Sequence, residues 1–252
     1  MVLAKRYPSE NWELLNATIY ADALLLYLDT VIQRGQKMYV NIKSGSLPQR
    51  ITFCRHAESV GNARGVDDNS TQTNANHQFE LSPLGQRQVI QTRDFIHALF
   101  PNGFSEYYVS SFLRTQVTFR GLFDGKIIPY EDPRLDEWWK GIFHSLSAEM
   151  IAQHYPAESA VLKREGWYHY RPPQGEAGKD VEVRILSFLN SLTPVDDIFI
   201  CGHGRWFNYF ERLLLQISRE ETKARAPDNC SIIQLTKAGN KYSSELLFTP
   251  SD

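Results

Sequence analysis

Two histidines that each follow a short apolar run are the residues of this sequence best suited to do chemistry. His56 follows Arg55 at the end of the run 51–54, and His203 lies between two glycines after the run 197–200. Both runs are typical of buried strands, and an open α/β sheet places its ligand crevice at the carboxyl ends of its strands. We therefore expect the two histidines to meet there, in a pocket suited to binding and attacking a phosphoryl group.

Phosphoryl transfer through a histidine makes further demands on the chain. The nucleophile is a neutral imidazole whose other nitrogen is held by a hydrogen bond, and cations or N–H groups must surround the phosphoryl oxygens. Arg114 follows a third expected strand end at Ser110, so its guanidinium is predicted at the same edge of the sheet. Gly204, directly after His203, permits a close approach to an open helix N-terminus, which favours an anion.

The acid that must protonate the leaving oxygen has three candidates in one short segment. Asp132, Asp136 and Glu137 all precede the pair Trp138 and Trp139. A general acid has to be a carboxyl group beside the reacting oxygen, and each of the three meets that demand by residue type. The residues alone leave the choice open. The two tryptophans are expected to pack or to line the pocket.

The remaining histidines and the cysteines indicate no metal site and no cofactor. Five histidines show no paired ligand spacing, and we assign them to the surface or to packing: His77, His97, His144, His154 and His169. Cys54 and Cys201 fall inside expected strands, where inert packing is the expected role. The sequence also lacks a Walker loop and a dinucleotide fingerprint. We therefore predict a chemistry with neither metal nor cofactor.

Composition narrows the class of protein. A hydrophobic content of 42% supports a sizeable core and excludes a disordered chain. The net charge of −2 gives no reason to expect a nucleic-acid partner. Three cysteines are too few for a disulfide scaffold and fit a reducing compartment. Residues 1–8 lack the pattern of a signal peptide, and the run 21–28 is too short and polar to span a membrane, so a cytoplasmic location is expected.

Strand and helix patterns alternate along most of the chain. We predict strands over 51–55, 107–110, 126–130, 198–201, 232–235 and 244–248, helices over 82–99, 113–123, 179–192 and 205–216, and a helix-rich aromatic stretch over 135–170. This alternation indicates an α/β fold, a three-layer sandwich in which helices flank a mostly parallel central sheet.

The first 48 residues are expected to form an N-terminal helical extension. Apolar residues recur at helical spacing over 9–33, a short strand pattern follows over 38–42, and the segment 44–48 is rich in turn residues. We predict an extension over 1–48 and one catalytic domain over 49–252. The helix is expected to pack on that domain; contact with a second copy, in a homodimer, is the alternative.

At these residues the sequence resembles the histidine phosphatase superfamily, branch 1, whose fold is phosphoglycerate mutase-like. The first element is an Arg-His run followed by Glu-Ser and Asn, and a later element joins Ser110 to Arg114 and Thr118. The elements stand in family order at 55–62, 81–86, 110–118, 135–141, 173–176, 202–204 and 227–231. Each of these motifs is weak alone, but together they are highly specific.

The resemblance implies a role for each candidate residue. His56 would become phosphorylated, and Glu137 would act first as acid and then as base. The phosphate would be held by a larger set: Arg55, Asn62, Arg114, His203 and Gly204. Ala57 stands where the family commonly has glycine, a change that we expect the loop to tolerate.

Three functions are consistent with this resemblance. The segment 65–79 lacks the pattern of glycolytic mutases, their basic insertion is not recognisable, and the run 171–176 is similar to that of phosphatase-type members. We therefore expect a metal-independent phosphomonoesterase that acts on a small phosphorylated metabolite. A phosphoglycerate mutase-type transfer is the first alternative, and a weakly catalytic binding protein on the same fold is the second.

Overall fold

The computed structural model describes residues 47–64, 76–144, 146–218, 221, 226–239 and 241–251. The predicted helix over 9–33, the strand over 38–42 and all of the predicted extension except residues 47 and 48 lie outside these residues. The same holds for most of the polar loop that follows the first histidine motif.

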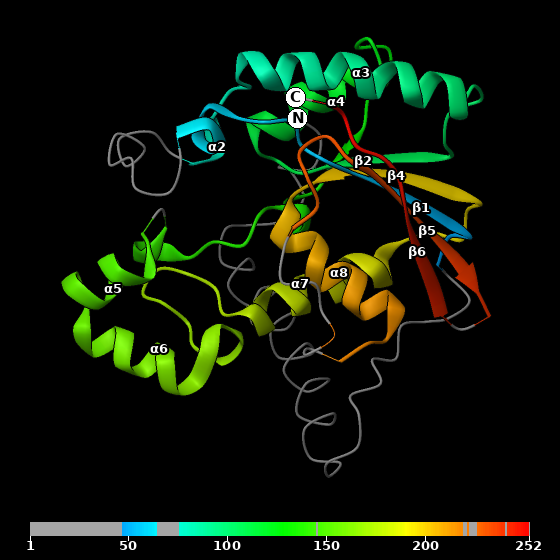
Figure 1. The fold of residues 1–252 in the computed structure, drawn as a ribbon. Helices are drawn as coiled ribbons and strands as arrows, with labels where there is room; N and C mark the ends of the chain where they lie inside the picture. The colour runs from blue at the N-terminus through cyan, green and yellow to red at the C-terminus, as the bar shows by residue number, and fades with distance from the viewer. Residues whose placement is uncertain are drawn as a thin grey trace, which may run out of the picture. The chain divides into compact units, whose positions relative to one another are not determined.

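A six-stranded sheet forms the centre of the described fold (Figure 1). Its strands, in spatial order, are β3 (Tyr130–Glu131), β2 (Glu106–Val109), β4 (Asp197–Gly202), β1 (Arg50–Arg55), β5 (Ile232–Ala238) and β6 (Lys241–Phe248). The first four run parallel to one another, and β5 and β6 are antiparallel to their neighbours. The predicted mostly parallel sheet is confirmed.

Helices cover both faces of this sheet. The α-helices of the described residues are α2 Val60–Arg64, α3 Pro83–Leu99, α4 Leu113–Leu122, α5 Ala148–His154, α6 Pro156–His169, α7 Gly178–Ser191 and α8 Gly204–Leu215. Figure 1 shows α3 and α4 over one face and α7 and α8 over the other, which confirms the layered architecture. The helices α5 and α6 form a separate pair with its own small core around Phe143 and Tyr170.

Local sequence explains where the main helices begin and which face they bury. At the start of α3, the hydroxyl of Ser82 accepts a hydrogen bond from the Gly85 amide at 3.0 Å, with proline at the first helical position. In α8, Trp206, Phe207 and Phe210 are all buried against the sheet side of the helix. The Phe207 ring stacks on Phe53 of β1 with centroids 4.2 Å apart, so aromatic packing fixes α8 to the central strand.

The predicted strand over 126–130 is wrong in its position. Only Tyr130 and Glu131 pair with β2, and the Ile128 side chain is 95% exposed. Proline at 129 has no N–H to donate to a ladder, and in this run only Ile127 packs against the core. The chain therefore pairs only after the proline, in the very short edge strand Tyr130–Glu131.

The helix-rich aromatic stretch over 135–170 is confirmed. Hydrogen bonds join its N-terminal part, near Trp138 and Trp139, to the segment 173–176. The Trp139 carbonyl accepts from the Glu176 amide at 2.8 Å, and the Trp138 indole donates to the Glu176 carbonyl at 2.8 Å. Gly141 has φ of 53°, and a Cβ at this position would lie 2.1 Å from the Pro173 carbonyl oxygen. The two segments can therefore meet only because residue 141 has no side chain.

The Gly141→Ala substitution tests this close approach. We expect the free energy of unfolding to fall by about 2 kcal/mol or more, because a left-handed backbone and a clash with rigid backbone atoms act together. Gly239→Ala is the matched control: Gly239 also has positive φ, of 63°, but a Cβ there would meet nothing within 4 Å. That variant should lose only about 1 kcal/mol. Equal losses in chemical denaturation would contradict the proposed steric role of Gly141.

Candidate active site

The candidate residues gather at the carboxyl ends of three adjacent strands. His56 follows β1, His203 follows β4, and Ser110 follows β2, which lies on the other side of β4. The amide of His56 donates to the Gly202 carbonyl at 2.9 Å, and that of Ser110 donates to the Cys201 carbonyl at 3.2 Å. These bonds continue the ladders past the strand ends, and the expected meeting of the two histidine segments is confirmed.

Arg114 of α4 lies between the two histidines. Its Nε donates to His56 Nε2 at 3.2 Å, and its Nη2 donates to His203 Nδ1 at 3.3 Å. The two imidazole rings are 5.2 Å apart between centroids, and all three side chains are buried. Burial lowers the pKa of Arg114 to about 10 and the Glu137 charge opposes this fall, so the guanidinium stays charged at neutral pH. One cation thus contacts both histidines at once.

His56 has the protonation state that a nucleophile needs. Its Nδ1–H donates to the Ala57 carbonyl at 2.7 Å, because a carbonyl can only accept, and this leaves the lone pair on Nε2 facing Arg114. Burial, followed by the charges of Arg114 and Arg55, lowers the pKa of His56 well below its ordinary value. The imidazole is therefore neutral, with one nitrogen held and the other available for attack.

His203 is held from the opposite side. Its Nε2 lies 2.8 Å from the hydroxyl of Ser110, which in turn donates to Asp136 Oδ1 at 2.7 Å. Burial lowers the pKa of His203 well below its ordinary value, and nearby Arg114 and His56 lower it further. Both histidines are therefore neutral when no anion is bound.

The structure separates the three candidate acids by their partners. Asp132 accepts from the Arg134 amide and forms an ion pair with the Arg134 guanidinium at 2.6 Å. Asp136 is held by Ser110 and Ser111. Only Glu137 has its carboxylate at the beginning of α8, next to His203.

Glu137 covers the N-terminus of α8. Its oxygens accept from the amides of Trp138 at 2.9 Å, Arg205 at 3.3 Å and Trp206 at 3.0 Å. The sequence predicted an open helix end that favours an anion, and the anion bound there is this carboxylate. Of the three, Glu137 opposes the lowered pKa of Arg114 most strongly, ahead of Asp136, and its carboxylate lies at the helix end that follows His203.

A loop before β5 holds the backbone of the first histidine motif. Arg55 Nη1 donates to the Pro227 carbonyl at 2.7 Å, and the Asn229 side chain donates to the His56 carbonyl at 2.8 Å. A Cβ on Gly204 would lie 3.3 Å from Arg55 Nε and 2.5 Å from the Ala226 Cβ. The glycine therefore allows Arg55 to lie against the start of α8.

Asn62, unlike the buried histidines and Arg114, has an exposed side chain. It lies in α2 with an exposed side chain, and its carboxamide oxygen accepts from the Ser59 amide at 3.2 Å and from the Ser59 hydroxyl at 3.0 Å. The structure shows how Asn62 closes the turn after the motif. Its contact with phosphate stays a prediction.

An aromatic and basic rim follows Glu137 in the chain. Trp139 is 39% exposed and stacks on His144 with ring centroids 5.0 Å apart. Lys140 Nζ lies 4.9 Å from the Trp167 ring centroid, and burial lowers the pKa of this lysine. Trp139 and Lys140 follow Glu137 closely in the chain.

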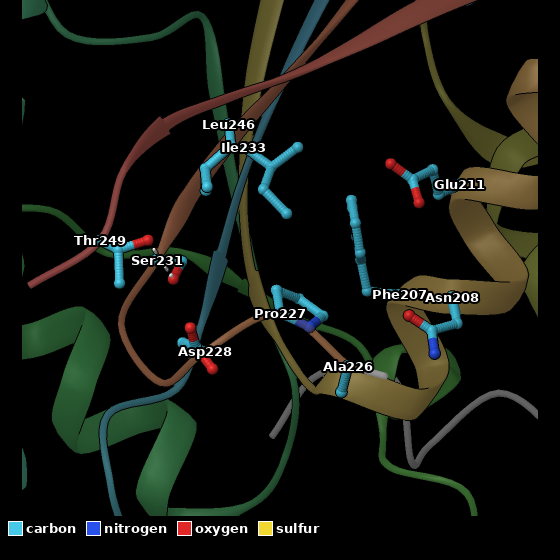
Figure 2. Close-up of a pocket in the computed structure, with 10 residues that line it drawn as sticks. All are labelled: Phe207, Asn208, Glu211, Ala226, Pro227, Asp228, Ser231, Ile233, Leu246 and Thr249. Carbon is cyan, nitrogen blue, oxygen red and sulfur yellow. Dashed lines mark hydrogen bonds between the residues drawn. The ribbon is translucent and has the colours of Figure 1, made fainter. Parts of the chain in front are cut away.

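A hollow of about 220 Å³ opens beside the loop that holds Arg55 (Figure 2). Phe207, Pro227, Ile233 and Leu246 contribute apolar walls to it. None of the candidate catalytic residues lines it, so we assign it no part in the chemistry. Within the described ranges, no group of three His, Cys, Asp or Glu side chains is arranged to hold a metal ion, and no helix is long and apolar enough to cross a membrane.

Comparison with known proteins supports the family first inferred from the motifs. The sequence profile of the histidine phosphatase superfamily (branch 1) matches residues 51–249. Phosphoglycerate mutase-like protein AT74 of Arabidopsis thaliana is 32% identical over 157 residues, covering 58% of this chain and 47% of that protein. Rattus norvegicus 6-phosphofructo-2-kinase/fructose-2,6-bisphosphatase 1 is 29% identical over 159 residues, covering 62% of this chain and 30% of that protein. The chain thus spans about half of the first relative and a smaller part of the second.

Solved structures share the fold. The alpha-ribazole phosphatase from Shigella flexneri has a TM-score of 0.64 at 18% identity, covering 79% of this chain and 95% of that one. A mycobacterial glucosyl-3-phosphoglycerate phosphatase, solved with VO3, has a TM-score of 0.58 at 20% identity, covering 79% of this chain and 98% of that one. At such identities the likeness concerns the fold, while the profile match covers most of the sequence. The chain belongs to the histidine phosphatase superfamily (branch 1).

Proposed function

We propose that this chain is a metal-independent phosphomonoesterase that acts through a phosphohistidine on a small phosphorylated metabolite. The observation that carries the proposal is the neutral His56, whose Nε2 lone pair faces the guanidinium of Arg114 beside His203. A nucleophile and donors for the phosphoryl oxygens are thereby in contact, as phosphoryl transfer requires.

The proposed reaction has two steps. In the first, Glu137 has taken up a proton from solvent, His56 Nε2 attacks phosphorus, the ester P–O bond breaks, and Glu137 gives that proton to the leaving alcohol. In the second, Glu137 takes a proton from water as the water oxygen attacks phosphorus, and the P–N bond breaks to release inorganic phosphate. Arg55, Arg114 and His203 hold the phosphoryl oxygens in both steps. Asn62 and the backbone of Gly204 are proposed to add contacts to the phosphate.

A mutase is the second candidate, and the mutase-like name of the Arabidopsis relative is the observation that favours it. A mutase would pass the phosphoryl group from His56 to a second hydroxyl and would need a bisphosphate primer. Release of inorganic phosphate without primer supports the phosphatase. Primer-dependent interconversion of phosphoglycerates supports the mutase, and binding of phosphorylated ligands without either reaction supports a binding protein.

The cysteines and the net charge bear on the cellular compartment and on the class of substrate. Three thiols, Cys54, Cys201 and Cys230, are buried and unpaired, which supports a reducing compartment such as the cytoplasm. A net charge of −2 supports a small-molecule substrate rather than nucleic acid. Cys54 is fully buried, and burial raises the pKa of its thiol well above the ordinary value, so it takes no part in the reaction.

Replacement of the nucleophile tests the proposed function. His56→Ala should lower kcat for an aryl phosphate by at least about a thousandfold, because no other side chain replaces the attacking nitrogen. Vanadate should still bind, and in a crystal it should lie between residue 56 and His203. His154→Ala, at an exposed histidine of α5, is the control and should keep kcat within about twofold. Near-normal hydrolysis by His56→Ala would overturn the assignment of the nucleophile.

Replacement of the proposed acid should affect substrates with poor leaving groups more than substrates with good ones. Glu137→Gln should slow the hydrolysis of alkyl phosphates by about a hundredfold and that of nitrophenyl phosphate much less, because a good leaving group needs no proton. Glutamine can still accept from the α8 amides, so the melting temperature should change little. Asp132→Asn is the matched control on the same segment. Equal losses of Glu137→Gln on both substrates would show that another group is the acid.

A further inference from the structure

A buried serine connects the second histidine to a carboxylate. Ser110 is fully buried, and its Oγ lies 2.8 Å from His203 Nε2 and 2.7 Å from Asp136 Oδ1. Asp136 also accepts from the Ser111 amide at 2.9 Å and from the Ser111 hydroxyl at 2.7 Å. The carboxylate is therefore fixed in place independently of the histidine.

The hydrogen bonds that link Asp136, Ser110 and His203 allow only one arrangement of protons. A carboxylate only accepts, so the Ser110 hydroxyl donates to Asp136 and its lone pair accepts from His203 Nε2–H. The neutral ring then has no proton on Nδ1, which accepts from Arg114 Nη2 at 3.3 Å. The opposite tautomer would place two donors against each other at Arg114 and leave Nε2 without a proton donor at Ser110.

This tautomer presents a lone pair to the place where the phosphoryl group is proposed to bind. Phosphoryl oxygens carry negative charge and would be repelled by the lone pair on Nδ1. A proton on Nδ1 removes the repulsion and adds a charge-assisted donor. The resulting imidazolium has N–H groups on both nitrogens, one toward the phosphoryl oxygen and one toward Ser110.

We propose that Asp136 is a positioning residue that, through Ser110, holds His203 ready to take up one proton as an oxyanion binds. The inference rests on the proposed function, because it concerns how the phosphoryl group is held. Asp136 touches neither the phosphoryl group nor His56, and it acts on His203 only through the serine hydroxyl. The proton comes from solvent and stays on Nδ1 until the oxyanion leaves.

The charges around His203 explain why the proton arrives with the anion and not before. The groups that face it or adjoin it are Arg55 at the end of β1, His56 after it, Arg114 on α4, Arg184 on α7, and Glu137, whose carboxylate accepts from the first amides of α8. The arginines oppose a further positive charge in the empty site. A bound dianion offsets them, and the Asp136 carboxylate, relayed by Ser110, then stabilises the imidazolium.

Sulfate is the probe for this coupling, because it is a dianion that does not titrate near neutral pH. Calorimetry at pH 7.5 in two buffers with different heats of ionisation should show uptake of about one proton for each sulfate bound. Since binding takes up a proton, sulfate affinity should fall as pH rises, by about tenfold per unit where the uptake is complete.

Ser110→Ala and Asp136→Asn test the relay. Each should weaken sulfate binding at pH 7.5 by about tenfold and at least halve the proton uptake. Ser110→Ala leaves both Ser111 bonds to Asp136 in place but removes the bond that the Phe112 amide donates to Ser110 Oγ at 3.3 Å. Asp136→Asn keeps the Phe112 bond, so the two variants together separate the relay from a change at the start of α4. Asp132→Asn removes a carboxylate from the same segment without touching the relay and should keep the wild-type uptake.

Four results of the sulfate experiments would contradict the proposed protonation of His203. Wild-type uptake in Ser110→Ala, sulfate binding without proton uptake, or no sulfate binding by the wild type would each overturn the inference. Uptake that disappears in His56→Ala or in Glu137→Gln and persists in Ser110→Ala would place the proton on that residue instead and also overturn the inference. The proposed function is tested separately by phosphate release from a phosphomonoester, so either can fail while the other stands.

Discussion

The contact of one arginine with two neutral histidines is the interaction on which the rest of the site depends. Arg114 donates to a lone pair on each ring, and a protonated imidazole could not accept either bond. Burial and neighbouring positive charge keep both rings neutral, as the lowered pKa values of His56 and His203 indicate. The cation that joins the two histidines is also the one proposed to contact the phosphoryl group.

The fold supports this contact with elements that come from distant parts of the sequence. Pairing of β1 with β4 brings the ends of two histidine segments together, and β2 adds Ser110 on the other side of β4. The amide of Ala57 donates to the Thr118 hydroxyl at 3.0 Å, which ties the histidine loop to α4. Buried aromatic rings between β1 and α8 then fix the helix whose N-terminus lies beside Glu137.

Much of the fold and most of the site could be predicted because they follow from local pattern. Short apolar runs predicted the two histidine strands, and motif spacing placed Arg114 at the same sheet edge. The short edge strand was misplaced because edge pairing depends on a neighbour rather than on the residues themselves. The choice of Glu137 rested on family resemblance, since three carboxylates of equal residue type differ only in their partners in space. The roles of Ser110 and Asn229 were missed, because a hydrogen bond across strands leaves no periodic signal in the sequence.

If His56 carries the phosphoryl group during turnover, the phosphohistidine can be trapped before water hydrolyses it. Full-length protein should be mixed with an excess of a rapidly cleaved aryl phosphate, quenched in alkali, where phosphohistidine persists, and mapped by peptide mass spectrometry. We expect one added phosphoryl group on the peptide that contains His56, and none on the peptide that contains His203. Phosphate release without any labelled peptide, or a label on another residue, would contradict it.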